Sequence, residues 1–364
     1  MPELFGWLGP EPEKYPFYDG AVTLYFDDKA HSYYRYDGDE TIYVPGVTTV
    51  VGIVDRSAAL MQWASNQCAE YMGEWYRENT DCDFEAFQAA LDKARMAHKD
   101  YKEDAANVGK IAHGWLERHI ISLMDTGHPT GESMPEDSRA ANGVHAALNW
   151  MDAHKVRWVF TERKVYSLRH DYAGTGDGLA YISSCGNPEC CGKWVKTYGR
   201  WERVALKFTD ALALIDWKTS NQLHASYDWQ TAGYDKAVEE EIGIHGKFPM
   251  LQQLVEYRVI IKLGKDDGEF DARLLTMDTL ERDFTTFLQC LDLYRSTDSV
   301  EQEDKQRKRE LRQQEREDRE AANLIACPKS GEFKGFRYPK CNGGEPCATC
   351  LAKYNERQAA KAAA

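Results

Sequence analysis

The sequence predicts an α/β fold with a mixed central sheet flanked by helices and a cysteine-rich C-terminal tail. Strand-like and helix-like segments alternate along residues 157–294, as expected when helices cover a sheet. A chain of 364 residues can bury the large core that such a sheet requires. Cysteines gather in residues 327–364, where glycine and proline are also frequent, which distinguishes the tail from the rest of the chain.

The composition indicates a soluble globular protein. Hydrophobic residues make up 43% of the chain and charged residues 29%, and no segment reaches the ~18–20 apolar residues that a membrane helix needs. The N-terminus has no basic start followed by an apolar run, so we expect no secretory signal, and the ten cysteines are then reduced thiols or metal ligands. The net charge of −14 argues against a protein that coats nucleic acid non-specifically, but an enzyme can still bind a phosphate backbone in a local basic cleft.

Hydrophobic periodicity divides the chain into five parts. Alternating apolar and β-branched residues, broken by Asp-Asp and Asp-Gly turn signals, predict extended structure over residues 21–54. From Ser57 to about Ile121, and again over 140–154, apolar residues recur at helical spacing. The expected parts are an N-terminal β-rich entry region (1–56), a helical region (57–155), a core (156–296) with a cysteine-containing insertion (184–203), a charged helical connector (297–326) and a cysteine-rich metal-binding tail (327–364).

Within the core, short apolar and β-branched runs predict strands, and longer periodic segments predict helices. The strands are expected at residues 157–168, 174–183, 204–219, 254–264 and 270–277, and the helices at 226–243 and 278–294. The charged run at 301–324 has a helix-forming composition, which favours a solvated helix or connecting arm over a direct contact with nucleic acid.

The run ALIDWKTS at residues 213–220 ends an apolar strand with two charges on one face. Successive side chains of a strand point to opposite faces, so Asp216 and Lys218 lie together and Trp217 points away. Asp177 follows a glycine-rich segment, AGTGDG, which is expected to form a tight turn where a second group can approach closely. If the two strands pair, both carboxylates can share a Mg²⁺ beside the lysine, and this set of groups suits phosphodiester hydrolysis. The alternative is an ordinary ion pair at the end of a strand.

Two pairs of polar residues stand on helices before and after these strands. His113 and Glu117 are at positions i and i+4 in GKIAHGWLERH, and Gln230 and Tyr234 are at i and i+4 in DWQTAGY. Each pair therefore shares one helix face. A single helical histidine is more often a packed or surface residue than a ligand, so the order of all the motifs carries the functional interpretation.

Four motifs follow one another along the chain: GKIAHGWLE (109–117), GTGDG (174–178), IDWKTS (215–220) and QTAGY (230–234). Their order resembles the PD-(D/E)xK nuclease superfamily, and within it the RecB-like branch that includes phage recombination exonucleases and Cas4-type nucleases. The opening YVPGVTTVVG, followed by AALMQWA, is similar to that of phage and prophage members. The resemblance covers roughly residues 25–295 and implies a restriction-endonuclease-like core.

The resemblance also implies a role for each motif residue. The implied ligands of Mg²⁺ or Mn²⁺ are His113, Asp177, Asp216 and the main-chain carbonyl of Trp217. Lys218 is the implied catalytic lysine, which positions the attacking water and stabilises developing charge. The acid of the (D/E)xK motif is Asp in this chain, as suits RecB-like members. Supporting roles are implied for Glu117, Glu162, Gln230 and Tyr234.

The activity that the resemblance implies is metal-dependent hydrolysis of DNA, as an exonuclease that processes DNA ends in recombination, repair or phage replication. The expected location is the cytoplasm of a bacterial or phage-infected cell. No GxxxxGK[ST] motif occurs, so ATP dependence would require a helicase partner; a single-strand-annealing partner and a homo-oligomer are also compatible with the family. The alternatives are a Cas4-like iron–sulfur nuclease and a catalytically silent DNA-binding subunit, the latter opposed by the complete motif set.

The insertion at residues 184–203 interleaves basic and aromatic residues. Cations bind phosphates and aromatic rings stack on bases, so we expect this insertion to contact a single strand or a duplex end. An ordinary β-hairpin with a basic edge is an equal alternative. The expected DNA-binding residues are Lys193, Lys196, Arg200 and Trp201, interleaved with Trp194, Tyr198 and Arg203.

The cysteines form two groups that could bind metal. The tail group is Cys327, Cys341, Cys347 and Cys350. Its Cys-x2-Cys spacing suits a tetrahedral thiolate site for Zn²⁺ or, as in Cas4-type relatives, a [4Fe–4S] cluster; all four residues follow the core, which favours zinc. The second group is Cys185, Cys190 and Cys191, which could hold a separate zinc ion or lend a ligand to the tail but lacks an evident fourth ligand.

Overall fold

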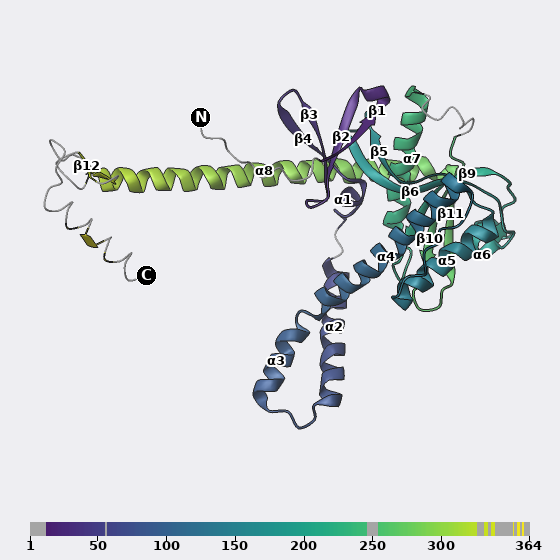
Figure 1. The fold of residues 1–364 in the computed structure, drawn as a ribbon, viewed down its shortest axis with the longest axis horizontal. Helices are drawn as coiled ribbons and strands as arrows, with labels where there is room; N and C mark the ends of the chain where they lie inside the picture. Colours follow the sequence, from purple (N-terminus) through teal and green to yellow (C-terminus); the bar gives the residue numbers. More distant parts are fainter. Residues whose placement is uncertain are drawn as a thin grey trace. The chain divides into compact units, whose positions relative to one another are not determined.

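The computed structural model of the chain describes residues 12–54, 57–245 and 254–325, two short strands at 331–333 and 336–338, and residues 352, 355, 356 and 359. The chain forms two compact units, residues 1–293 and residues 294–364 (Figure 1). No helix in the described part is long and apolar enough to cross a membrane.

The first unit begins with a four-stranded antiparallel sheet. Its strands are β1 (Glu13–Phe17), β2 (Val22–Asp27), β3 (Ser32–Asp37) and β4 (Glu40–Val44), with a 3-10 turn, η1 (Tyr18–Gly20), between the first two. The apolar face of this sheet packs on Tyr166 and Ala173 of the core. The Ala173 N–H also donates to the Pro45 carbonyl at 3.0 Å, so the entry sheet is joined to the core by backbone as well as side chains.

A short helix, α1 (Val47–Val51), replaces the extended structure predicted for the end of the entry region. The run VTTVV is rich in β-branched residues, which favour strands. However, the buried residues Val47, Val50 and Val51 recur at i, i+3 and i+4, the spacing of one helix face. Burial at helical spacing therefore overrides intrinsic strand preference, and the prediction of a strand was wrong here.

Four longer helices follow, as the periodicity predicted. They are α2 (Ser57–Glu78), α3 (Phe84–Ala94), α4 (Ala97–Thr126) and α5 (Ser138–His154). Asp83 and Asp137 cap α3 and α5, because their carboxylates accept hydrogen bonds from free backbone N–H groups in the first turn. Gly127 ends α4 with a φ of 74°, in the left-handed region that favours glycine. Helix α4 contacts both α2 and strand β5 of the core (Figure 1).

The core is a five-stranded sheet in the order β11-β10-β9-β6-β5. Its strands are β5 (Arg157–Ser167), β6 (Tyr172–Ile182), β9 (Ala211–Lys218), β10 (Tyr257–Leu263) and β11 (Phe270–Thr276). Only β9 and β10 are parallel, and helix α7 (Ala225–His245) connects them, as a parallel crossover requires. The predicted mixed sheet flanked by helices is confirmed.

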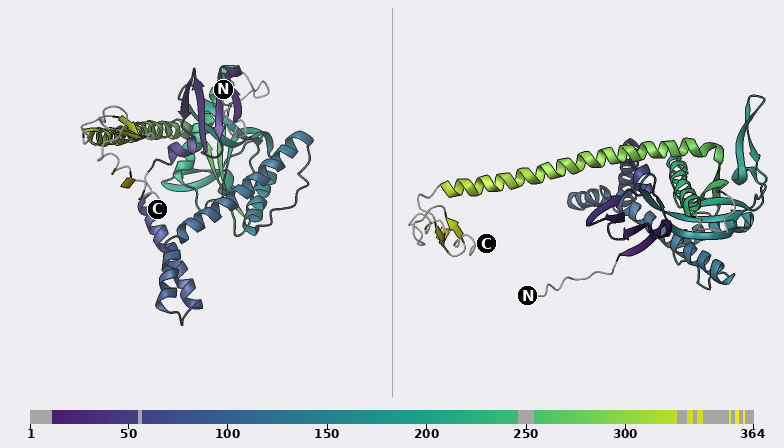
Figure 2. Two further views of the ribbon diagram at one scale, coloured as in Figure 1. Left: turned by 60° about the vertical axis from the view of Figure 1, so that its left-hand side comes forward. Right: turned by 90° about the horizontal axis from the view of Figure 1, so that it is seen from above.

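Helices cover both faces of this sheet (Figure 2). The main hydrophobic cluster joins α4 and α5 to one face and includes Ala213, Ile215 and Trp217 of β9. Because side chains alternate along a strand, Asp216 and Lys218 point to the opposite face, where α7 packs. The expected arrangement of the DWK segment, with its two charges on one face and the tryptophan on the other, is thus present.

The third core strand predicted, residues 204–219, is divided in two. Its first residues belong to β8 (Arg200–Ala205), which pairs with β7 (Gly192–Thr197) in a separate two-stranded sheet, the β7–β8 hairpin. Residues 206–210 join neither strand, because the Leu206 N–H donates to the Cys191 carbonyl and the Phe208 carbonyl accepts from the Ser184 N–H. A one-turn helix, α6 (Pro188–Cys191), leads directly into the hairpin. Figure 2 shows the hairpin as a teal ribbon that extends from the core sheet.

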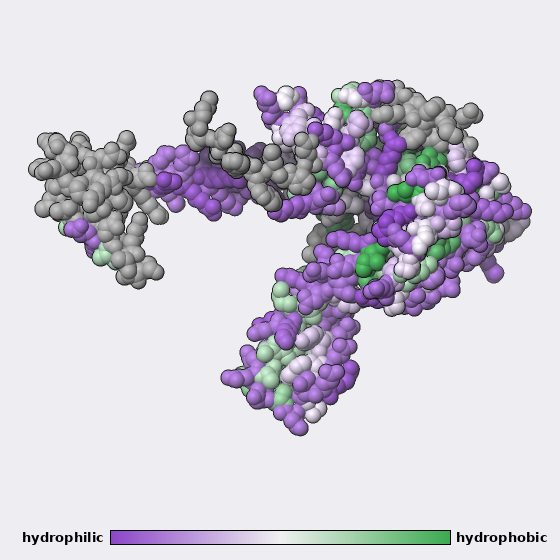
Figure 3. Space-filling model, viewed as in Figure 1, coloured by the Kyte–Doolittle hydropathy of each residue, from purple (hydrophilic) through white to green (hydrophobic). Residues whose placement is uncertain are grey.

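A turn, η2 (Met277–Thr279), precedes the 46-residue helix α8 (Leu280–Ile325). The predicted helix at 278–294 and the charged run at 301–324 are therefore one helix. Within the first unit α8 buries an apolar face that includes Phe284 and Phe287. From residue 299 to residue 317 nearly all side chains are exposed, and this stretch is coloured hydrophilic in Figure 3. The second unit also contains β12 (Gly331–Phe333) and β13 (Phe336–Tyr338).

Candidate functional site

Two acidic residues from neighbouring strands meet on the α7 face of the core sheet. The antiparallel register of β6 and β9 pairs Gly178 with Ile215, so Asp177 and Asp216 are the next pair along the ladder and share a face. One Asp177 carboxylate oxygen accepts a hydrogen bond from the Trp217 N–H at 2.7 Å. The sequence-based expectation that these two acids converge is therefore met by the register.

A third acidic residue, Glu162, extends this row to the edge strand. The register of β5 and β6 continues through the pairs on either side and places Glu162 beside Asp177. Glu162 has a φ of 45°, which is uncommon for a residue with a side chain and typical of local strain at functional positions. We call Glu162, Asp177 and Asp216, on three adjacent strands, the carboxylate row.

His113 approaches the carboxylate row from α4. Its Nδ1 lies 3.7 Å from a Glu162 carboxylate oxygen. Ligand atoms of His113, Glu162 and Asp177 all lie within 4.8 Å of one another, close enough to share one ion. Burial alone would lower the pKa of His113, but Glu162 and Asp177 hold it above its usual value. The predicted ligand His113 thus joins the row, and Glu162, expected only in support, lies among the potential ligands.

Asp216 and Lys218 form a buried ion pair with 2.7 Å between Nζ and a carboxylate oxygen. Asp216 is 1% exposed, and neither of its oxygens accepts a directed hydrogen bond from a described residue. Burial raises the pKa of Asp216 to about 6, the charge of Lys218 opposes this rise, and Asp177 adds to it. A buried carboxylate paired with a lysine, next to two more acids and an imidazole, fits a divalent cation that prefers oxygen ligands.

Lys218 remains charged in this environment. Burial would lower its pKa, but the carboxylates of Asp216 and Asp177 hold the pKa above its usual value. Its ammonium also lies 4.8 Å from the centre of the Tyr227 ring, within the range of a cation–π contact. The side chain is therefore held between a carboxylate and an aromatic ring, and it can act as a fixed positive charge.

Gln230 and Tyr234, the predicted helical pair on α7, lie against this site. The Gln230 amide donates to the Tyr234 hydroxyl at 3.0 Å, and both residues are buried. Burial and the nearby charge of Asp216 raise the pKa of Tyr234 well above its usual range, so the phenol stays protonated. The pair therefore forms a neutral, hydrogen-bonded wall beside the acids.

The GTGDG motif is not the tight turn that the sequence analysis predicted. Residues 174–178 lie inside strand β6. A Cβ on Gly174 would come within 2.5 Å of the Tyr234 ring, and one on Gly178 within 2.4 Å of Trp158. These glycines are required for close packing of aromatic rings against the strand, rather than for a bend.

A cavity of about 620 Å³ opens over the carboxylate row. Glu117, on the same helix face as His113, lines its wall but lies outside the group of potential ligands. Lys110 and Lys164 add positive charge to the wall, and the entry sheet contributes Tyr33. These three residues were not predicted from the sequence. Lys110 lies inside the GKIAHGWLE motif, whereas nothing in the sequence connects Tyr33 with a site about 80 residues further on.

The predicted DNA-binding residues lie elsewhere, on the β7–β8 hairpin. Its register pairs Lys196 with Trp201 and Trp194 with Arg203, so these four side chains share one face. Trp194 and Trp201 are 64% and 63% exposed. Lys193 and Arg200 belong to the opposite face.

The base of the hairpin lies close to the polypeptide that follows Lys218. A second cavity, of about 670 Å³, is lined by Lys193, Trp194 and Arg203 and by residues 221–223. The tail metal site predicted at Cys327, Cys341, Cys347 and Cys350 lies outside the described residues.

Residues 76–353 match the family model described as the PD-(D/E)XK nuclease superfamily. The matched region includes His113, the complete carboxylate row, Lys218 and the helix that carries Gln230 and Tyr234. A search of the curated proteins found no match.

Proposed function

Because the chain belongs to the PD-(D/E)XK nuclease superfamily, we propose that it is a divalent-metal-dependent deoxyribonuclease that degrades DNA from its ends. The observation that carries this proposal is the carboxylate row with its neighbouring imidazole and lysine on one face of the core sheet. The order of the motifs, which is that of RecB-like enzymes, supports a role in processing DNA ends during recombination, repair or phage replication.

The cation, Mg²⁺ or Mn²⁺, would be held by His113, Glu162 and Asp177, whose ligand atoms lie close together. Asp216, which pairs with Lys218, is a further candidate ligand on the adjacent strand. The main-chain carbonyl of Trp217 is a further candidate ligand. In an antiparallel pair the N–H and C=O of one residue face the same neighbouring strand. Because the Trp217 N–H donates to Asp177 of β6, the Trp217 carbonyl also faces β6. When bound, such a cation polarises the phosphate and makes water a stronger nucleophile.

Lys218 provides a fixed positive charge for the reaction. Because the adjacent carboxylates keep its ammonium protonated, it is a hydrogen-bond donor and cannot serve as the base. As a donor it orients the attacking water and stabilises the negative charge that develops on the phosphate when water adds to phosphorus and a P–O bond breaks. Lys110 and Lys164 on the cavity wall attract the DNA backbone, and the Gln230–Tyr234 pair fixes the position of the neighbouring strand.

The test compares wild-type protein with Lys218→Ala on end-labelled linear DNA and on closed circular DNA, with and without Mg²⁺. We expect wild-type protein to degrade only the linear DNA, only with Mg²⁺, and Lys218→Ala to be at least ~100-fold slower. Lys207→Ala, which removes an exposed lysine outside the cavity, serves as the matched control.

Three results would change the proposal. Nicking of circular DNA would indicate an endonuclease. Equal rates for wild-type protein and Lys218→Ala would remove Lys218 from the mechanism. Binding of DNA without cleavage under any metal condition would indicate a silent DNA-binding subunit.

A further inference from the structure

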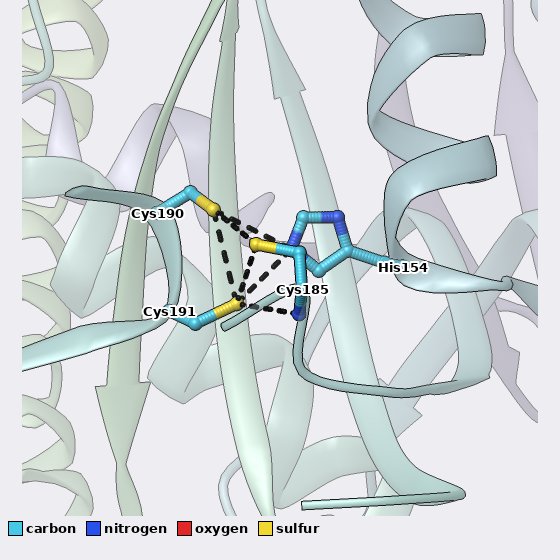
Figure 4. Close-up of side chains that lie close together, drawn as sticks. All are labelled: His154, Cys185, Cys190 and Cys191. Carbon is cyan, nitrogen blue, oxygen red and sulfur yellow. Dashed lines mark hydrogen bonds between the residues drawn. The ribbon is translucent and has the colours of Figure 1, made fainter. Parts of the chain in front are cut away.

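Four potential metal ligands meet beyond the end of β6, where helix α6 leads into the β7–β8 hairpin (Figure 4). They come from three separate segments: the last residue of α5, the loop after β6, and helix α6. We call them the thiol–imidazole cluster: His154, Cys185, Cys190 and Cys191. The histidine supplies the fourth ligand that the sequence did not reveal.

The distances within the cluster suit a single ion. The Sγ atom of Cys191 lies 3.3 Å from that of Cys185 and 3.8 Å from that of Cys190. Zinc–sulfur bonds of about 2.3 Å place two thiolates of a tetrahedral site about 3.8 Å apart. Cys185 and Cys190 are closer, at 2.8 Å, which is longer than the ~2.05 Å of a disulfide bond. Cys185 is in a loop and is only partly buried, so it can move outward when an ion binds.

The histidine is oriented as a metal ligand should be. Its Nδ1 lies 2.8 Å from the Trp150 carbonyl and donates to it, which leaves the Nε2 lone pair free. That Nε2 lies 3.2 Å from the Sγ of Cys191 and 3.7 Å from that of Cys190. The ring is further fixed by stacking on Trp150 at 4.6 Å. A backbone carbonyl that fixes the tautomer in this way is the usual second partner of a metal-binding histidine.

We propose that the thiol–imidazole cluster binds a structural Zn²⁺ ion. Three thiols and one imidazole form a complete tetrahedral set, and such closed sets are structural rather than catalytic. His154, Cys190 and Cys191 are buried, which leaves no open position for a substrate. An iron–sulfur cluster does not fit, because its thiolates bind different irons and must lie farther apart than these.

The ion would fix the base of the hairpin to the core. An isolated two-stranded hairpin is only marginally stable in water. Cys191 directly precedes Gly192, the first residue of β7, while His154 belongs to a helix that packs on the core sheet. Zinc would therefore join α5 to the start of the hairpin and set the direction of its aromatic face.

The first test measures metal in the full-length protein after replacement of the four tail cysteines by serine, so that only the thiol–imidazole cluster can bind. We expect about one zinc ion per chain, lost when Cys191→Ser is added and retained when Cys290→Ser, another buried cysteine, is added instead. Absence of zinc from the tail variant, a stoichiometric Cys185–Cys190 disulfide, or equal zinc after Cys191→Ser would overturn the proposal.

The second test begins with the native protein. In the native protein Cys185, Cys190 and Cys191 should resist alkylation, and a zinc chelator should expose all three, as mapped by mass spectrometry. His154→Cys should retain zinc and give a cobalt-substituted spectrum with more thiolate character, whereas His154→Ala should lose zinc. Alkylation at equal rates with and without chelator would contradict a bound ion. None of these readouts depends on nuclease activity.

Discussion

Glu162 holds its carboxylate in the candidate site on a left-handed backbone, with a φ of 45° in the middle of an edge strand. For a residue with a Cβ this conformation costs about 1–2 kcal/mol, and it persists only where the surroundings enforce it. The two neighbouring strand pairs remain in register on either side. The strain therefore directs one side chain toward His113 without moving the strand.

This strain predicts an inverted order of stability at position 162. Glu162→Gly should be more stable than Glu162→Ala by about 1 kcal/mol, because only glycine adopts this φ without penalty. At the nearby Lys164, which has no positive φ, Ala should be the more stable replacement. Urea denaturation of the four variants measures both differences. If alanine were the more stable replacement at both positions, Glu162 would be unstrained.

Gly174 and Gly176 are two positions apart on β6 and differ in the space above them. A Cβ on Gly174 would meet the Tyr234 ring at 2.5 Å, whereas one on Gly176 would have 3.9 Å to its nearest neighbour. We expect Gly174→Ala to destabilise the protein by about 1–3 kcal/mol and to reduce nuclease activity, because the Tyr234 ring must move. Gly176→Ala should stay within about 0.5 kcal/mol of the wild type. Thermal unfolding and initial rates of both variants check this.

At the level of elements, α7 connects the candidate site to the sheet. Gln230 and Tyr234 face the cavity, and the next residue, Asp235, faces the fully buried Arg258 of β10. Arg258 donates to Asp283 of α8 at 2.8 Å, and this pair is already neutral. Asp235, at 4.0 Å from Arg258, accepts no hydrogen bond from a described residue. Asp235 is thus a second buried acid beside an arginine whose charge Asp283 already balances.

Asp235 should make stability depend on pH. Burial, then the charge of Glu239, raises its pKa from 3.8 to about 8, against the opposing charges of Arg258 and Lys236. Between these values the folded state binds the proton that the unfolded state releases. The contribution of Asp235 to stability is therefore greatest below pH ~4 and falls as the pH rises toward 8, by at most about 1.4 kcal/mol per unit. Denaturation of Asp235→Asn over this range should remove that slope. An unchanged slope would mean that Asp235 is ionised in the folded protein.

At the level of the whole molecule, local patterns predicted the elements better than their pairing. The motif order predicted the mixed sheet, because each of its strands and helices has a clear periodicity. The division of residues 204–219 was missed, because it depends on backbone hydrogen bonds to residues 184 and 191. The helix at Val47–Val51 was missed because its burial against the core is not a local property.

The same distinction applies to the sites. Alternation along β9 predicted that Asp216 and Lys218 share a face, and the register brings Asp177 to them. The position of Glu162 depends on a local backbone distortion, and that of His154 on the packing of α5 beside α6. The spacing of residues in the sequence predicts neither of these two positions. The sequence therefore reveals the three thiols of the thiol–imidazole cluster but not its imidazole.

The aromatic face of the hairpin should bind DNA without taking part in the chemistry. Base stacking on an aromatic ring is worth about 1–3 kcal/mol, so Trp201→Ala should raise KM for single-stranded ends by about 10-fold and leave kcat unchanged. Val204→Ala, on the opposite face of the same strand, should leave both constants unchanged. If the zinc ion orients the hairpin, a zinc-selective chelator, used with Mg²⁺ in excess, should raise KM for wild-type protein and have little further effect on Trp201→Ala. Equal KM values for the two variants would remove this face from DNA recognition, because only Trp201→Ala removes an aromatic ring from it.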